Sequence, residues 1–181
     1  GGGGGGSNPG GGTTTPPAAP DLTDRAISIK LSCAIKNYAS RDVKLGTKRI
    51  VEVRAWAFYK VQPDGRIDFA YSATNSPPGP GWGYAGGRTQ YGDTVGRIYK
   101  MAHVANNVSF NGSRPGASPN QLVGNVDGFE MQLYNAVHEA AHLIRDSNEQ
   151  EAFWYGIDAV LAWRADKGRD CAKDDDDKPS K

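Results

Sequence analysis

The chain has 181 residues and a formal net charge of +1, with 24 glycines, 11 prolines and two cysteines. This length suits one domain of ordinary size with tails. The charge is too balanced for an electrostatic nucleic-acid binder, and no apolar run approaches the roughly 18 residues that a membrane span needs. We therefore expect neither a nucleic-acid-binding nor a membrane-spanning protein.

Both ends of the chain are predicted to lie outside the folded domain, which we expect to span residues 21–172. Residues 1–20 carry no charge and consist almost wholly of Gly, Pro, Thr, Ser and Ala. Such a segment buries too little apolar surface to offset the entropy of ordering, so it is predicted to be a flexible linker. Residues 173–181, which include the run KDDDDK, are predicted to be a disordered acidic tail or an engineered cleavage-site remnant.

The first half of the domain is predicted to form strands. Residues 26–33 and 48–62 alternate apolar and polar side chains, and a Pro-Asp-Gly turn would bring residues 66–72 back as a hairpin partner. Residues 75–96 are rich in Gly, Pro and aromatic residues and are predicted to form a long loop. Further strands are expected within residues 97–110.

The last third is predicted to be helical. Apolar residues recur at helical spacing over Gly128–Arg145 and again over Glu149–Ala165, and Asn148 is placed to cap the second helix. Strands followed by helices favour an α+β fold, with a small antiparallel or mixed sheet followed by two helices.

The two cysteines, Cys33 and Cys171, stand near the two ends of the predicted domain. A count of two excludes four-cysteine zinc sites and disulfide-dense scaffolds. Either one bridge joins the two ends, which would suggest an oxidising compartment, or the two residues are unrelated buried thiols. The sequence does not choose between these alternatives.

The sharpest feature is the pentapeptide His138-Glu139-Ala140-Ala141-His142 within the first predicted helix. Residues four apart share a helix face, so both imidazoles can bind one metal ion, and Glu139 can act as general base towards a metal-activated water. Given the three histidines of the chain, chance would produce this pattern on the order of 0.001 times. The pattern therefore predicts a zinc site rather than two surface histidines.

A catalytic zinc needs a third protein ligand and one open position. The next predicted helix begins with two carboxylates, Glu149 and Glu151, and a tight turn would bring them back beside the histidines. The remaining histidine, His103, lies upstream in a predicted strand or loop.

A helix with this motif, followed by a helix that bears glutamate, resembles the gluzincin branch of the zincin metallopeptidases. The segment 148–153 (NEQEAF) is similar to one in anthrax lethal factor and related toxin peptidases, and this resemblance implies Glu151 as the third ligand. The thermolysin type would select Glu149 instead. We predict Glu151. The aspartate that the thermolysin type has four residues after its ligand is here Tyr155 or Phe153, so Asp158 or a backbone carbonyl would have to orient the histidines.

The resemblance also implies where a substrate would bind. Zincins place an edge strand beside the active-site helix, and Val104–Phe110 is the candidate for pairing with a peptide. Oxyanion stabilisation needs a donor beyond the zinc, for which Tyr155, Tyr134, Arg145 and His103 are candidates. We single out Tyr155, one turn beyond Glu151, although packing between the helices would explain it equally well.

Together these features predict a zinc metallopeptidase that hydrolyses peptide bonds, resembling the toxin or effector modules of larger secreted bacterial proteins. We expect Zn²⁺ as cofactor, a protein or peptide substrate, a monomer, and export directed by a signal outside this sequence. Two alternatives stay open. One is another zinc hydrolase, such as an amidase, with the same site. The other is a non-enzymatic binding module without metal, in which the predicted β hairpin and the loop bearing Trp82 and Tyr84 would form the recognition surface.

Overall fold

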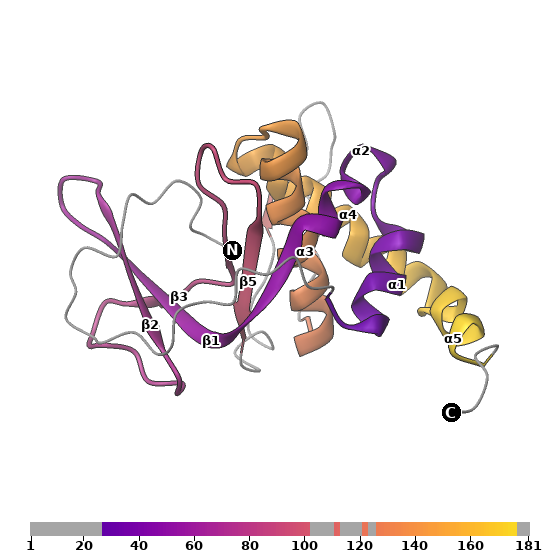
Figure 1. Cartoon of the computed structure of the whole chain (residues 1–181), viewed down its shortest axis with the longest axis horizontal. Helices are drawn as coiled ribbons and strands as arrows, with labels where there is room; N and C mark the ends of the chain where they lie inside the picture. Colours follow the sequence, from indigo (N-terminus) through magenta and orange to yellow (C-terminus); the bar gives the residue numbers. More distant parts are fainter. Residues whose placement is uncertain (1–26, 102–110, 113–120, 123–125, 177–181) are drawn as a thin grey trace.

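The computed structural model describes residues 27–101, 111–112, 121–122 and 126–176, and its fold is α+β as predicted. A curled mixed sheet lies at one end of the molecule and the helices lie at the other (Figure 1). The predicted linker, residues 1–20, falls outside the described residues.

The long strand β1 (Ile50–Val61) organises the main sheet, which has five strands. It pairs antiparallel with β2 (Ile67–Ser72), which confirms the predicted hairpin. Its other edge pairs antiparallel with β3 (Gly83–Tyr84) and parallel with β5 (Gly96–Lys100), and β4 (Gly87–Arg88) pairs antiparallel with β5. The short strands β6 (Asn111–Gly112) and β7 (Gln121–Leu122) form a separate antiparallel pair. The predicted loop 75–96 therefore contains two strands, β3 and β4.

Alternation along β1 separates two cores. Val51, Val53, Ala55 and Ala57 pack with Phe69, Ala85 and Tyr99 on one face of the sheet. Ile50, together with Ile98 of β5, packs against the helices. Each face of the strand is thus buried for part of its length, which explains why both sets of alternating residues include apolar side chains.

The predicted strand over residues 26–33 is wrong. The chain there enters helix α1 (Ile29–Tyr38), followed by the short helix α2 (Arg41–Lys44) and the 3₁₀ turn η1 (Gly46–Arg49). The buried side chains of α1 recur at helical spacing: Leu31, Ala34, Ile35 and Tyr38. Most of that repeat lies beyond Cys33, so an eight-residue window displayed only an accidental alternation.

Helices α3 (Gly128–Arg145) and α4 (Glu149–Asp166) confirm the two predicted helices and pack against each other. Asp127 and Glu130 form a capping box at the start of α3, and Asn148 caps α4 as predicted. Between the helices, Asp146 takes the left-handed conformation with φ 51°, which ends α3 and turns the chain back. α3 also contacts β4 and β5, so one of its faces is covered by the sheet.

Cys33 of α1 and Cys171 of helix α5 (Arg169–Asp176) form a disulfide, which decides between the two alternatives that the sequence left open. α5 continues through Asp176 into the segment predicted as a tail.

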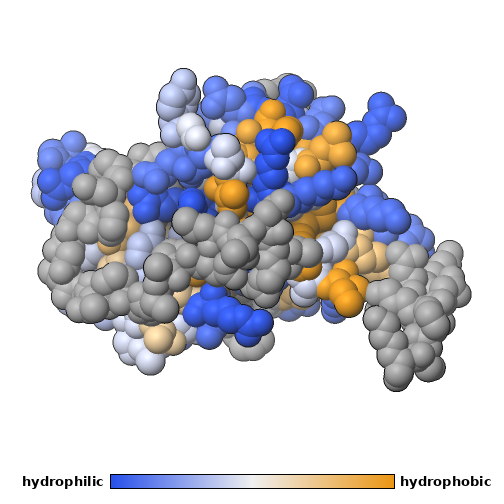
Figure 2. Space-filling view, in the orientation of Figure 1, coloured by the Kyte–Doolittle hydropathy of each residue, from blue (hydrophilic) through white to orange (hydrophobic). Residues whose placement is uncertain are grey.

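Among the described residues, none of the helices is long and apolar enough to cross a membrane. On the face seen in Figure 2, hydrophilic side chains cover much of the surface and apolar ones are scattered among them.

An ion pair between Glu130 and Arg164 joins α3 to α4. The guanidinium donates from Nε to Oε2 over 2.7 Å and from Nη2 to Oε1 over 2.8 Å. Burial alone would raise the pKa of Glu130, but the hydrogen bonds from Arg164 and from the Asp127 amide lower it below its usual value. The ionised carboxylate therefore stabilises the fold.

Replacing Glu130 by glutamine is expected to destabilise the protein at pH 7 by roughly 1–2 kcal/mol. This is the contribution of a charge-assisted hydrogen bond, reduced because the ion pair is partly exposed to solvent. Because the folded-state pKa is lowered, this stabilisation is present above the unfolded value near 4.5 and is lost as the pH falls through the folded value. Urea unfolding of the wild type and the variant at pH 7 and pH 3 measures the difference in their free energies of unfolding. This difference should be smaller at pH 3. The exposed Glu151→Gln is the control. A difference that is the same at both pH values would contradict the assignment.

Candidate metal centre

Three potential ligand groups meet where α3 and α4 join. The Nε2 atoms of His138 and His142, one helical turn apart, are 3.2 Å from each other. Glu149, the first residue of α4, places Oε1 2.9 Å from Nε2 of His142 and Oε2 3.3 Å from Nε2 of His138. The three ligand atoms lie within 4.8 Å of one another, and two histidines with one glutamate are a common set of zinc ligands.

The hydrogen bonds around His142 fit a cation at this point. Nδ1 lies 2.7 Å from the carbonyl oxygen of Ser147. Because a carbonyl can only accept, we assign a proton to Nδ1, so that the neutral form of His142 presents the Nε2 lone pair to the Glu149 carboxylate. Two lone-pair-bearing groups at this distance require a proton or a metal ion between them, and a bound metal would satisfy both.

Electrostatics also suit a metal site. Burial lowers the pKa of His138 to about 4, although the Glu149 hydrogen bond opposes this, so the ring is neutral and able to ligate at pH 7. Burial would raise the pKa of Glu149, but the two imidazoles beside it hold that pKa far below its usual value. Burial lowers and Glu149 raises the pKa of His142, with a net rise. The site thus contains an ionised carboxylate next to two imidazoles.

Glu139 lies against the sheet and is fully buried. The Thr89 hydroxyl donates to its Oε1 over 2.7 Å, whereas Oε2 has no hydrogen-bond partner in the described part of the chain. Gly87 of β4 leaves the space that this carboxyl occupies, since a Cβ there would lie 2.7 Å from Oε2. Burial raises the pKa of Glu139 to about 7, against the Thr89 hydrogen bond. A carboxyl with this pKa can both accept and release a proton near neutral pH.

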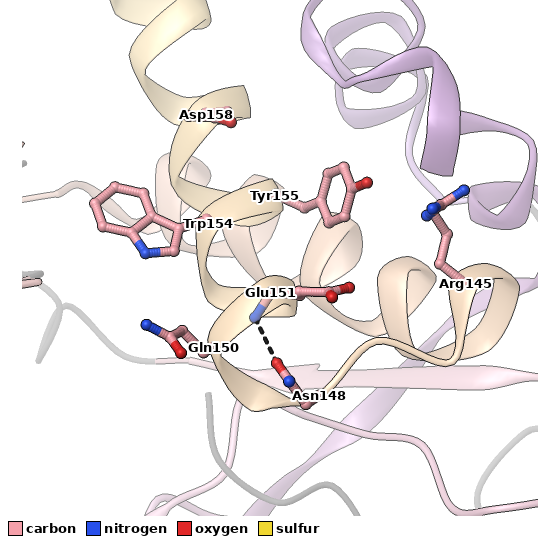
Figure 3. A pocket seen from close by; sticks show the side chains of 7 residues that line it. All are labelled: Arg145, Asn148, Gln150, Glu151, Trp154, Tyr155 and Asp158. Carbon is pink, nitrogen blue, oxygen red and sulfur yellow. Dashed lines mark hydrogen bonds between the residues drawn. The ribbon is translucent and has the colours of Figure 1, made fainter. Parts of the chain in front are cut away.

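The structure does not bring Glu151 to the histidines. Its backbone amide donates to Asn148 Oδ1 over 2.8 Å, and its side chain lies near Tyr155 and Arg145 along a separate cavity of about 500 Å³ (Figure 3). Glu149 and Glu151 are two positions apart, so they point to different sides of the helix. Glu149, which the thermolysin-type alternative selects, is therefore the carboxylate at the histidines.

The other predicted site residues are spread over the molecule. Tyr155 faces the cavity of Figure 3, where its hydroxyl lies 3.4 Å from Asp42, and Arg145 and Asp158 line the same cavity. Tyr134 is buried with its ring centroid 5.2 Å from that of His138. His103 and the predicted edge strand Val104–Phe110 lie outside the described residues.

Sequence reasoning missed the contact of β4 with α3, which positions Thr89 beside Glu139. The signal was the pair Gly86-Gly87, because adjacent glycines often mark a close approach of the backbone to another element. Gly86 packs on Asn135 of α3 as Gly87 packs on Glu139. Tyr84 of the predicted recognition loop lies in strand β3, and its ring packs against Phe58 of β1.

A cavity of about 540 Å³ gives access to the site. His142 and Glu149 form part of its wall, together with residues 146–148 and the turn between β4 and β5, residues 89–93. A substrate could therefore approach two of the three candidate ligands from solvent.

A scan against protein-family models finds no match for this chain, and searches of curated proteins and of solved structures find none either. The case for a function therefore rests on the sequence motif and on the geometry of the site.

Proposed function

We propose that this chain is a zinc-dependent metallopeptidase, with His138, His142 and Glu149 as metal ligands and Glu139 as general base. The convergence of two imidazole nitrogens and one carboxylate, with a buried carboxyl next in sequence to the first histidine, carries the proposal. The cavity beside the ligands supports a substrate that reaches the site from solvent.

The chain's own residues supply positioning and proton transfer. A bound zinc ion would contribute Lewis acidity, which lowers the pKa of water and polarises a carbonyl. The Ser147 carbonyl fixes the orientation of His142, and Thr89 fixes one oxygen of Glu139. The other oxygen of Glu139 accepts a proton from the attacking water and later delivers it to the leaving amine.

Replacing Glu139 by glutamine tests the proposal. Glutamine keeps the size of the side chain and can still accept from Thr89, but it cannot accept the water proton. The variant should bind zinc like the wild type and hydrolyse a mixture of internally quenched peptides roughly 10²–10⁴-fold more slowly. Elemental analysis and initial rates provide the two readouts, with Glu151→Gln as control. Equal rates for Glu139→Gln and wild type would show that Glu139 is not the general base. A zinc-loaded wild type that cleaves no peptide would contradict the proposed peptidase function.

The disulfide bears on where such an enzyme would act. A Cys33–Cys171 bridge is compatible with an extracellular protein, because disulfides persist in oxidising compartments. We infer an exported monomer that acts on a protein or peptide substrate.

A further inference from the structure

The cavity beside the metal ligands has an acidic wall. Asp93, Asp146 and Glu149 line it, and no lysine or arginine is found among the described residues of its lining. Zinc would take Glu149, and Asp93 already accepts hydrogen bonds from Arg97 over 3.3 Å and from a backbone amide. Asp146 is thus the carboxylate that remains to meet a substrate, since within the described ranges it has no ion pair.

The fold does not require an aspartate at position 146. Its φ of 51° is a conformation in which glycine is free of strain and asparagine is well tolerated. Asp146 is exposed at the end of α3, three positions before the candidate ligand Glu149. Its charge is therefore available for recognition, and it can be removed without changing the backbone.

Ser147 provides an independent observation that a ligand belongs here. It is 7% exposed and lines the cavity, and its hydroxyl lacks a hydrogen-bond partner in the described part of the chain. A buried hydroxyl without a partner costs roughly 1–3 kcal/mol, which a bound donor would recover. Tyr91, which also lines the cavity and is 97% exposed, offers a ring face to a cation or to an alkyl chain.

We propose that this cavity binds a lysine or arginine side chain of the peptide substrate close to the scissile bond, with Asp146 as its ion-pair partner. The ammonium or guanidinium would donate to the Asp146 carboxylate and, once the Ser147 side chain turns towards the cavity, to its hydroxyl. The stem of the substrate side chain would lie against Tyr91. This specificity rests on the proposed peptidase function. An acidic side chain at the same place would meet Asp146 with like charge and would be disfavoured.

The test uses the zinc-loaded full chain and peptides that differ only in having lysine, arginine, norleucine or glutamate at one position near the scissile bond. Mass spectrometry first locates the cleaved bond, and kcat/KM is then measured for each peptide. At one position lysine or arginine should exceed norleucine at least tenfold. Asp146→Asn, which keeps the side-chain size and the left-handed backbone, should reduce that ratio to below threefold at unchanged zinc content.

Asp158→Asn is the matched control, because Asp158 lines the separate cavity of Figure 3 and the basic preference should survive its replacement. Cleavage without preference for a basic residue would overturn the inference and leave the peptidase standing. A preference that survives Asp146→Asn would overturn it as well. If the zinc-loaded wild type cleaves none of the peptides, both the inference and the proposed function fail.

Discussion

Replacing Glu149 by alanine is expected to weaken zinc binding by at least roughly 100-fold, whereas Glu151→Ala should bind zinc like the wild type. The Glu149 carboxylate lies 2.9 Å and 3.3 Å from the two Nε2 atoms, while Glu151 lines a different cavity. Loss of groups that merely support a ligand costs 10–100-fold in metal affinity, so loss of a ligand should cost more. Competition with a chelating dye gives the affinities, and elemental analysis after dialysis gives the stoichiometry.

The two variants form a matched pair. Both glutamates are exposed in the first turn of α4, so each substitution removes one favourable charge from the same helix N-terminus. A difference in zinc affinity therefore reports on ligation rather than on helix stability. Zinc retained by Glu149→Ala and lost by Glu151→Ala would transfer the ligand role to Glu151. If the wild type binds no zinc, the proposed metal site is wrong.

The sequence alone could not decide whether Glu149 or Glu151 lies at the histidines. The motif and the helix boundaries were predictable, because helical periodicity is unambiguous over Gly128–Arg145 and its neighbour. The direction of a carboxylate at the first or third position of α4 depends on how the chain turns between the helices. That turn rests on the left-handed Asp146 and on the Asn148 cap. Resemblance to toxin peptidases favoured Glu151, and local geometry places Glu149 at the histidines.

The surroundings of Glu139 were beyond the sequence for a different reason. Thr89 is 50 positions away, and the two meet only because β4 pairs with β5 and lies against α3. A two-residue strand has too little pattern to predict, and its pairing follows from the tertiary fold. The central strand β1 is long enough for its alternation to predict a strand. For α1 the prediction was wrong because the window 26–33 covers only the first five of its ten residues.

Replacing both Cys33 and Cys171 by alanine is expected to destabilise the protein by about 5 kcal/mol, because the bridge closes a loop with a sequence separation of 138 residues. Breaking the bridge increases the conformational entropy of the unfolded chain, and this increase is larger for a long loop than for a short one. The bridge joins α1 to α5, whereas the candidate metal ligands belong to α3 and α4. The loss of stability should therefore leave zinc affinity unchanged where the variant is folded.

Urea unfolding of the double variant and the wild type measures the stability difference, and a dithiol reductant added to the wild type should reproduce it. In thermal unfolding the same difference corresponds to a decrease in Tm of roughly 10–20 °C for a domain of this size. The single variants Cys33→Ala and Cys171→Ala should each lose nearly the full amount, because either one breaks the bridge. If the two single effects are small and simply add to give the double effect, the cysteines are independent thiols in solution, and the argument for an oxidising compartment falls with the bridge.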